Sequence, residues 1–276
     1  MGINVKDIAF SYTKNKPLFE HLNLQIENKP QIITIIGETG SGKSTLVEML
    51  NAILIPNKGE IEVFNHFIRP KKNKNLKNVR KDVGLVFQFS EYQLFEETVL
   101  KDVMFGPSNY KDLKSNALDS ALNALKLLQV DEALYERSPF NLSGGQMRKI
   151  AIAGILALNP QVLILDEPTV GLDAKAKVEL IKILVDLKQN QQKTIIIITH
   201  DMDLVAKIAD RAIVLKHGEI TFDGTPQNLF NQKALLKVSG LDLPLIGKIA
   251  EALKKDALID YSSIPLTLDE LLKVIR

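Results

Sequence analysis

The residues Gly37-Glu38-Thr39-Gly40-Ser41-Gly42-Lys43-Ser44-Thr45 directly follow an apolar run at 32–36 and lead into a helical pattern at 45–50. A strand, a glycine-rich loop and a helix in this order form a phosphate-binding loop. Its glycines let the backbone turn tightly, so that the N–H groups and the positive end of the helix can hold an anion. The stretch therefore predicts a nucleotide site at the centre of an α/β fold.

Two side chains of this loop point to a nucleoside triphosphate with its metal. Lys43 can reach the β- and γ-phosphates, and the Ser44 hydroxyl can bind Mg²⁺. The alternative is a glycine-rich turn with a chance lysine, which the complete pattern in its proper context disfavours. The loop alone identifies a nucleotide but no reaction.

The composition is that of an ordinary globular protein with a nearly balanced charge. A length of 276 residues suffices for one large domain with an appendage, and a net charge of +2 gives no electrostatic argument for nucleic acid. The absence of cysteine excludes thiol chemistry and fits a reducing compartment. Residues 1–7 lack the apolar core of a signal peptide, and no apolar run approaches membrane-spanning length, so we expect work at a membrane to depend on a partner.

The N-terminal region predicts a small antiparallel layer. Residues 3–12 and 18–26 have strand patterns, and residues 60–64 form another short strand. Tyr12, at the end of the first strand, could stack on an adenine ring or be an ordinary strand-end tyrosine. The lysine-rich run 69–81 is interpreted as a solvated loop, because no aromatic residues are interleaved with its cations.

Three further apolar runs predict buried parallel strands, and each leads to polar side chains. They are residues 83–87, followed by Gln88; residues 162–165, followed by Asp166 and Glu167; and residues 194–198, followed shortly by His200. Because parallel sheets bind ligands at the carboxyl ends of their strands, these side chains should gather near the loop. Asp166 can hold Mg²⁺, and Glu167 can accept a proton from an attacking water. The alternatives are a solvated acidic turn and a structural histidine.

The segment after Gln88 contains apolar and aromatic residues that an exposed loop does not explain. Phe89, Tyr92, Leu94 and Phe95 would suit a surface that docks a partner, or they could fill a local core. Residues 99–128 have a helical pattern with a break at Gly106-Pro107.

Leu142-Ser143-Gly144-Gly145-Gln146 precedes another helical pattern at 147–158. Glycine backbone and a serine at a helix N-terminus make a second anion site, although Ser143 could serve merely as an N-cap. Residues 174–188 predict a further helix, and 211–223 a closing hairpin. From residue 226 onward, short helices at 245–254 and 268–275 predict a small appendage without a visible catalytic motif.

The order of these motifs resembles the ATP-binding cassette (ABC) ATPase family over about the first 225 residues. The resemblance implies that Tyr12 stacks on adenine, that Gly37 to Ser44 are Walker A, and that Thr45 is a further ATP-binding residue. It implies that Gln88 is the Q-loop residue and a Mg²⁺ ligand beside Ser44 and Asp166, and that Glu167 follows Walker B as the base. Leu142 to Gln146 would be the signature, Asp173 would belong to the D-loop, and His200 would be the switch histidine. It also implies an ABC-ATPase domain over 1–225, with a helical signature subdomain at about 90–158, and a separate helical appendage over 226–276.

A narrower set of residues is similar to the ATPase subunits of energy-coupling factor (ECF) importers. The likeness is carried by residues 86–88, 91–99, 105–107, 146–149 and 265–271. Met147-Arg148 looks more like the second of the two paralogous ATPases. Ser90 departs from the family pattern, which usually has proline there, and this could loosen the docking loop.

The family's mechanism implies two ATPase subunits that close head to tail around two ATP molecules. The signature of one chain would then contact the ATP of the other, and Lys43, Gln88, Glu167 and His200 would serve hydrolysis with Mg²⁺. The implied partners are a paralogous ATPase (or a second copy), a transmembrane coupling subunit that the segment 89–95 docks, and a membrane subunit that selects vitamins, micronutrients or metal cations. The implied location is the cytoplasmic face of the cell membrane, and no nucleic acid is expected.

Three other functions fit the motifs less well. A soluble ABC ATPase for DNA repair or translation usually has a long coiled coil or tandem cassettes, which this chain lacks. A module that binds ATP without turnover would not need Glu167 and His200. A small-molecule P-loop kinase would not need the signature.

Overall fold

The fold is built on two β-sheets, seen in a computed structural model that describes residues 2–14, 16–71, 73–74 and 76–275. The strands are β1 (Ile3–Phe10), β2 (Phe19–Ile26), β3 (Gln31–Ile36), β4 (Lys58–Val63), β5 (His66–Ile68), β6 (Val83–Val86), β7 (Val162–Asp166), β8 (Thr194–Ile198), β9 (Arg211–Lys216) and β10 (Glu219–Gly224). The helices are α1 (Lys43–Leu50), α2 (Leu76–Asp82), α3 (Val99–Ser108), α4 (Ala117–Leu127), α5 (Gly144–Leu156), α6 (Ala174–Gln189), α7 (Met202–Ile208), α8 (Pro226–Phe230), α9 (Lys233–Val238), α10 (Leu245–Lys255) and α11 (Leu268–Val274).

The larger sheet has the strand order β10-β9-β3-β8-β7-β6, and only β10 joins it antiparallel. Every residue of β3 and β8 is buried. Runs of isoleucine suit such strands, because helices cover a parallel sheet on both faces. The carboxyl ends of β3, β7 and β8 therefore lie side by side, which places the predicted site residues at one edge.

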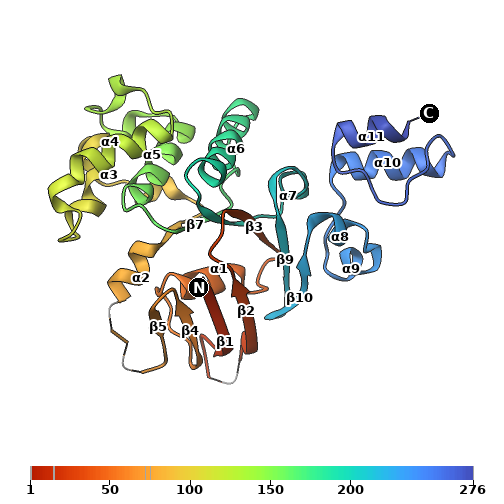
Figure 1. Cartoon of the computed structure of the whole chain (residues 1–276), viewed down its shortest axis with the longest axis horizontal. Helices are drawn as coiled ribbons and strands as arrows, with labels where there is room; N and C mark the ends of the chain where they lie inside the picture. Colours follow the sequence, from red (N-terminus) through yellow and green to blue (C-terminus); the bar gives the residue numbers. More distant parts are fainter. Residues whose placement is uncertain (1, 15, 72, 75, 276) are drawn as a thin grey trace.

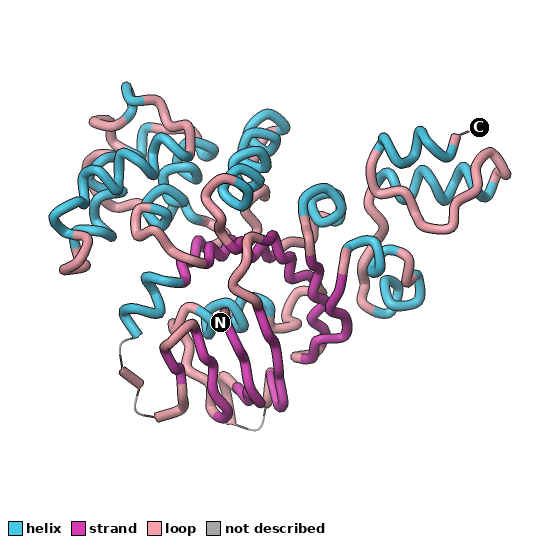
Figure 2. Tube along the Cα trace, viewed as in Figure 1, coloured by secondary structure: helices cyan, strands magenta, loops and turns pink. Residues whose placement is uncertain are grey.

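The smaller sheet is antiparallel in the order β2-β1-β4-β5, as the alternating N-terminal patterns predict. Helix α1 lies between the two sheets (Figures 1 and 2). Leu46 and Val47 of α1 share one buried cluster with Ile33 of β3 and Val5 of β1. This packing fixes the helix that follows the glycine loop, and so it fixes the direction of the helix N-terminus.

Helices α3, α4 and α5 form a group at one side of the larger sheet (Figure 1). Their apolar faces, with those of α6 and α7, share a second cluster with the opposite face of the sheet. The predicted break at Gly106-Pro107 lies close to the observed one, because α3 ends at Ser108 and α4 begins at Ala117. Pro107 stands in the last turn, where a missing N–H removes only one helical hydrogen bond.

The interpretation of residues 69–81 as a loop needs a correction, since α2 begins at Leu76. Lys72 of this run lies outside the described residues. The cations of α2 bind within the chain: Lys77 donates to the carbonyl of Asn109 at 2.6 Å, and Arg80 donates to that of Ala52 at 2.9 Å. They hold α2 to neighbouring elements, which explains a cationic run without a nucleic-acid partner.

The segment after β10 is more continuous with the core than its sequence suggests. Sequence patterns missed α8 and α9, and Phe230 and Leu236 of these helices share a buried cluster with Ile36 of β3. Helices α10 and α11 extend away from the rest of the chain (Figure 1) and have a small cluster around Ala250 and Leu271. The division into domains at residues 225 and 226 stays a prediction.

Candidate active site

The glycine loop joins β3 to α1 and depends on backbone conformations that favour glycine. Gly37, Gly40 and Gly42 have φ angles of 145°, 82° and 106°. A Cβ atom on Gly42 would lie 2.7 Å from Cζ of Phe19, and one on Gly37 would lie 2.0 Å from the carbonyl oxygen of Leu215. Conformation and close packing therefore both require glycine here.

Lys43 folds back over this loop. Its Nζ donates to the carbonyls of Gly37 at 2.8 Å and Glu38 at 2.9 Å. Burial lowers the pKa of Lys43, and the nearby Glu167 and Asp166 carboxylates counteract part of this effect. The ammonium group is thus held where the loop can enclose a phosphate.

Ser44 and Asp166 bring two oxygen ligands together from α1 and β7. The Ser44 hydroxyl donates to Oδ2 of Asp166 at 2.9 Å. Burial raises the pKa of Asp166; Glu167 raises it further, whereas the bond from Ser44 and the charge of Lys43 lower it. A hydroxyl and a carboxylate suit Mg²⁺, which prefers hard oxygen ligands and takes its remaining ligands from phosphates and water.

Glu167 has the geometry of a general base. Its φ of 48° is unusual for a side chain other than glycine, and its amide donates to the carbonyl of Ile198 at 2.9 Å. Oε1 lies 2.7 Å from Nδ1 of His200, whereas Oε2 is buried and has no hydrogen-bond partner among the described residues. A carboxylate oxygen that no donor satisfies can accept a proton once a water molecule reaches it.

These residues line one cleft of about 610 Å³. The lining contains Tyr12, Thr39, Gly40, Gly42, Lys43, Ser44, Thr45, Gln88, Asp166, Glu167 and His200, together with Leu18 and Ile198. The Tyr12 hydroxyl lies 2.9 Å from Oγ1 of Thr45, so this tyrosine belongs to the cleft. Sequence reasoning missed Leu18 and Ile198, because isolated apolar residues without a motif carry no signal of a site.

The other loop residues have different positions. The Glu38 side chain lies against Gly240, where an added Cβ would be 2.5 Å from Oε1 of Glu38. Ser41 is buried, and its hydroxyl has no partner among the described residues.

The signature residues lie in a separate pocket, together with the turn before α6. Ser143, Gly144, Gly145 and Gln146 line it with Gly171, Leu172 and Asp173. Ser143 is an N-cap: its Oγ accepts from the Gln146 amide at 3.3 Å, and Oε1 of Gln146 accepts from the Ser143 amide at 2.9 Å. Leu142 instead packs on the helical cluster. The structure therefore does not bring the signature to this chain's own nucleotide cleft.

Three of the four side chains predicted to dock a partner are exposed. Phe89, Tyr92 and Phe95 are 54%, 84% and 55% exposed, whereas Leu94 is 5% exposed. Leu94 packs in the helical core, which corrects its assignment to the docking surface. The buried carboxylate of Asp102 accepts from the amide of Phe95 at 2.8 Å and so anchors the segment to α3.

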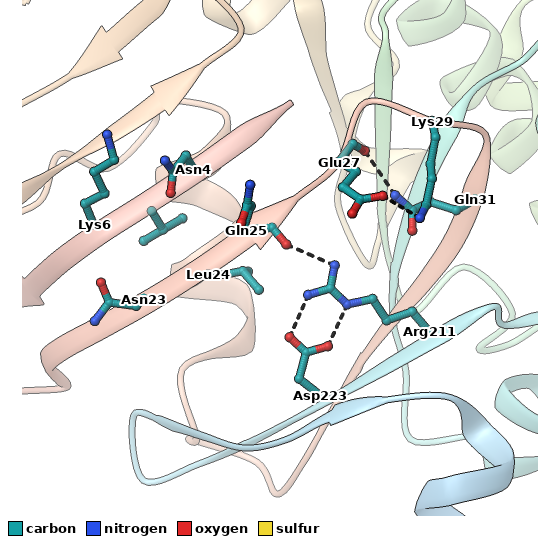
Figure 3. A pocket seen from close by; sticks show the side chains of 11 residues that line it. Asn4, Lys6, Asn23, Leu24, Gln25, Glu27, Lys29, Gln31, Arg211 and Asp223 are labelled. Atoms are coloured by element: carbon teal, nitrogen blue, oxygen red, sulfur yellow. Dashed lines mark hydrogen bonds and ion pairs between the residues drawn. The ribbon is translucent and has the colours of Figure 1, made fainter. Parts of the chain in front are cut away.

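Another polar cleft lies where β1 and β2 approach the β9–β10 edge (Figure 3). Arg211 donates twice to Asp223, at 2.6 Å each, and once to the carbonyl of Gln25 at 2.9 Å. Its guanidinium thus ties β9 to β10 and the smaller sheet. We interpret this cleft as a junction between sheets.

Comparisons with known proteins agree with this geometry. The ABC transporter profile matches residues 19–170. The energy-coupling factor transporter ATP-binding protein EcfA2 of Latilactobacillus sakei subsp. sakei is 44% identical over 281 residues, covering 100% of this chain and 96% of that relative.

Two solved structures are also similar. The structure of cbiO1 from Clostridium perfringens, part of the ABC transporter complex cbiONQ, has a TM-score of 0.75 and 35% identity over 90% of this chain and 98% of its own. A dimeric post-hydrolysis structure of the ATP-binding cassette MJ0796, bound to ADP and Pi, has a TM-score of 0.71 and 28% identity over 81% of this chain and 98% of its own. Fold, cleft and relatives agree, and the chain therefore belongs to the ABC transporter family, among the ATP-binding subunits of energy-coupling factor transporters, whose ATP hydrolysis is coupled to transport.

Proposed function

We propose that the cleft between α1 and the carboxyl ends of β7 and β8 binds and hydrolyses ATP to drive an ECF-type importer. The observation that carries this proposal is that Glu167, which has one carboxylate oxygen without a partner among the described residues, lines the same cleft as Lys43 and the Ser44–Asp166 pair. A phosphate binder, a metal holder and a base in one cleft supply what phosphoryl transfer to water requires.

The residues have the following roles in this proposal. The loop amides and Lys43 hold the phosphates, Tyr12 lies against the base, and Glu167 takes the proton from the attacking water. His200 holds Oε1 of Glu167 and so fixes this carboxylate at the cleft, which Gln88 also lines. Ser44 and Asp166, with Gln88, would hold Mg²⁺, which neutralises developing phosphate charge when it is bound.

The separate signature pocket supports a composite site. Ser143 and Gly145 with Asp173 form a surface that the chain's own cleft does not use. A partner ATPase that turns its glycine loop toward this surface would complete both sites. The dimeric MJ0796 cassette agrees with this arrangement, and the relationship to EcfA2 favours a paralogue as the partner over a second copy.

The proposed membrane contact is the exposed aromatic group Phe89, Tyr92 and Phe95. Within the described residues, no helix combines the length and apolar character that crossing a bilayer requires. A transmembrane coupling subunit that docks these aromatics would keep the chain at the cytoplasmic face of the membrane. A separate membrane subunit would select the cargo, which we propose is a vitamin, another micronutrient or a metal cation.

Affinity purification from detergent-solubilised host membranes, followed by mass spectrometry, tests this proposal. A paralogous ATPase and a polytopic membrane protein should be recovered with the chain. The matched control is a chain in which Tyr92 and Phe95 are replaced by glutamate, which should lose the membrane protein and keep the ATPase. Recovery of ribosomal or DNA-repair proteins with the unaltered chain would contradict the proposed role in an importer, whereas the proposed ATP hydrolysis would still stand.

A further inference from the structure

A buried arginine joins three parts of the ATPase that the mechanism above treats separately. Arg148 lies on α5, five residues after Ser143, and is 6% exposed. Its Nη1 donates to the carbonyls of Pro168 at 3.0 Å and Val170 at 2.6 Å. Its Nη2 donates to the carbonyl of Gln88 at 3.2 Å and lies 3.4 Å from Oε2 of Glu91. One guanidinium therefore bridges α5, the turn after β7 and the docking segment.

The turn that Arg148 contacts contains the proposed base. Pro168 directly follows Glu167, and the amide of Val170 donates to the carbonyl of Glu167 at 3.3 Å. Glu167 has a φ of 48°, a conformation that persists only where the surrounding structure imposes it. The two bonds from Arg148 to this turn are among the contacts that hold the Glu167 carboxylate in place.

On its other side, Arg148 contacts the beginning of the docking segment. The Gln88 side chain lines the nucleotide cleft, while its carbonyl accepts from Arg148. Glu91 lies in the short 3₁₀ helix Ser90–Gln93, between the exposed Phe89 and Tyr92. A movement of this segment must therefore either carry the guanidinium with it or break its bonds.

A planar guanidinium suits this position, and an ammonium does not. Arginine presents five N–H donors in a fixed fork, so it can bond acceptors on two sides at once. A lysine at position 148 would keep the charge but bring a single nitrogen, and it could not serve both the Val170 side and the Glu91 side. The need for two-sided donation distinguishes a bridge from a simple buried cation.

We propose that Arg148 is a positioning residue that couples the docking segment to the catalytic base. Displacement of Gln88 and Glu91 is transmitted through the guanidinium to Pro168 and Val170, and so to the Glu167 carboxylate. The coupling itself lies within this chain and concerns its ATPase activity. It rests on the proposed function in taking Glu167 as the base and in naming a membrane subunit as the partner that moves the segment.

The first test is the turnover of the Arg148→Lys chain in the ATPase-active assembly that copurifies with it. We expect kcat to fall by about 10- to 100-fold, the scale of a misplaced catalytic group, with the KM for ATP nearly unchanged because Arg148 is outside the cleft lining. The matched control is Arg80→Lys, which alters a guanidinium bonded to a main-chain carbonyl away from the cleft. A comparable fall in kcat for the control, or a rise in KM without a fall in kcat, would overturn the proposal.

The second test is a double-mutant cycle with Glu91→Gln, whose parent residue lies outside the nucleotide cleft. Glu91→Gln alone should lower kcat by about two- to tenfold and speed amide exchange in residues 168–172. In the Arg148→Lys chain, adding Glu91→Gln should change neither kcat nor the rate of amide exchange any further. Independent effects whose losses multiply would refute the coupling, and Glu91→Gln still tests it if Arg148→Lys fails to fold. Absence of a copurifying membrane protein would leave this test intact, so its outcome is separable from that of the importer.

Discussion

The glycine loop and the signature loop both lead into the N-terminus of a helix, but they satisfy their backbone differently. The glycine loop has three positive-φ glycines and holds Lys43 inside it. The signature loop closes on itself, since Ser143 and Gln146 cap each other. The first loop lies beside the proposed phosphate and metal ligands of its own chain, whereas the second lines a separate pocket that contains none of them.

This difference separates two kinds of glycine. Gly42 is enclosed, because a Cβ there would meet the Phe19 ring at 2.7 Å. Gly145 has room, since a Cβ would make only ordinary contacts with Ala176 at 3.5 Å and Leu172 at 3.7 Å. Glycine at 42 is thus required by the fold of this chain. No close contact within the described chain requires glycine at 145, as we expect if the partner's nucleotide approaches this position.

The largest expected effect is at the base. Glu167→Gln keeps the shape of the side chain but removes the proton acceptor, so ATP turnover should fall by about 10²–10⁴-fold. ATP binding should persist, since Lys43 and the loop are unchanged, and measurement of both kcat and nucleotide affinity separates the two. Unchanged turnover would show that Glu167 is not the base, and the cleft beside the glycine loop would then lack a proton acceptor in our proposal.

The next prediction tests the two glycines against each other. Gly145→Ala should leave the free energy of unfolding within about 0.5 kcal/mol of the native value, because the new methyl group fits. Turnover should nevertheless fall by roughly 100-fold, since the methyl group would displace a nucleotide held by the partner. Gly42→Ala should instead lower the free energy of unfolding by about 1–3 kcal/mol from backbone strain alone.

Thermal unfolding and steady-state ATPase assays of the two glycine variants provide the measurement. A large loss of stability in Gly145→Ala would mean that its own chain requires glycine there. The contrast between an enclosed loop and an open one would then fail.

Part of the site follows from local sequence. The glycine loop, the carboxylates after β7 and the histidine after β8 are specified by short motifs at strand ends, and parallel topology brings those ends together. The buried strands were equally predictable from their continuous apolar runs. The antiparallel layer followed from alternation, although its short strand β5 was missed.

Other features depend on tertiary contacts that no local pattern contains. The burial of Leu94 depends on packing against α3 and α5, while its neighbours Tyr92 and Phe95 stay exposed. The four acceptors around Arg148 come from segments 20 and more residues away in the chain. The exact end of α3 could not be predicted either, because a proline signals a break without showing how close the helix end lies.

The proposed docking surface, formed by Phe89, Tyr92 and Phe95, is the second region, after the signature loop, that we expect to face a partner. Tyr92→Glu places a charge on the most exposed of the three aromatics, and removal of an interface anchor typically costs at least about 2 kcal/mol, or roughly 30-fold in affinity. We expect weaker binding of the membrane subunit with unchanged nucleotide affinity, measured by titration in detergent. Lys126→Glu, at an exposed position of α4 that lines a different pocket, is a charge control that should bind normally. Unaltered binding of Tyr92→Glu would move the docking surface elsewhere.

The buried Asp166 carboxylate, a proposed Mg²⁺ ligand, should lower the stability of the chain while no nucleotide is bound. Because burial raises its pKa in the folded chain, the unfolded carboxyl loses its proton at lower pH. Between the two pKa values the folded state binds more protons, so stability falls as pH rises through that interval, and the cost persists at neutral pH. Asp166→Asn removes this cost, keeps an oxygen for Ser44, and should raise the Tm without ligand by roughly 2 °C at pH 7.

The same variant should lose the extra stabilisation that Mg²⁺ adds to bound ADP, measured as the difference in Tm with and without the metal. Without ligand, the rise in Tm caused by Asp166→Asn should shrink below pH 3.8, the ordinary pKa of an aspartate. At that pH Asp166 is protonated in both the folded and the unfolded chain. If Mg²⁺ still raised the Tm of the ADP-bound variant as it does that of the native chain, another group would hold the metal. A lower Tm without ligand would mean that the Asp166 charge stabilises the empty cleft.

The smallest effect concerns order within the docking segment. Ser90 is fully buried, its hydroxyl has no partner among the described residues, and it is the first residue of the 3₁₀ helix Ser90–Gln93. Proline is tolerated at the first position of a helix, where the N–H has no intrahelical acceptor. Ser90→Pro should raise the free energy of unfolding by about 0.5–1 kcal/mol, since it restricts the unfolded chain and removes an unpaired hydroxyl. Ser90→Ala, the matched control, removes only the hydroxyl and should stabilise less in denaturant titrations. A destabilising proline would show that the Ser90 amide has a partner in the native chain, and that the segment's order depends on this bond more than on the anchor at Asp102.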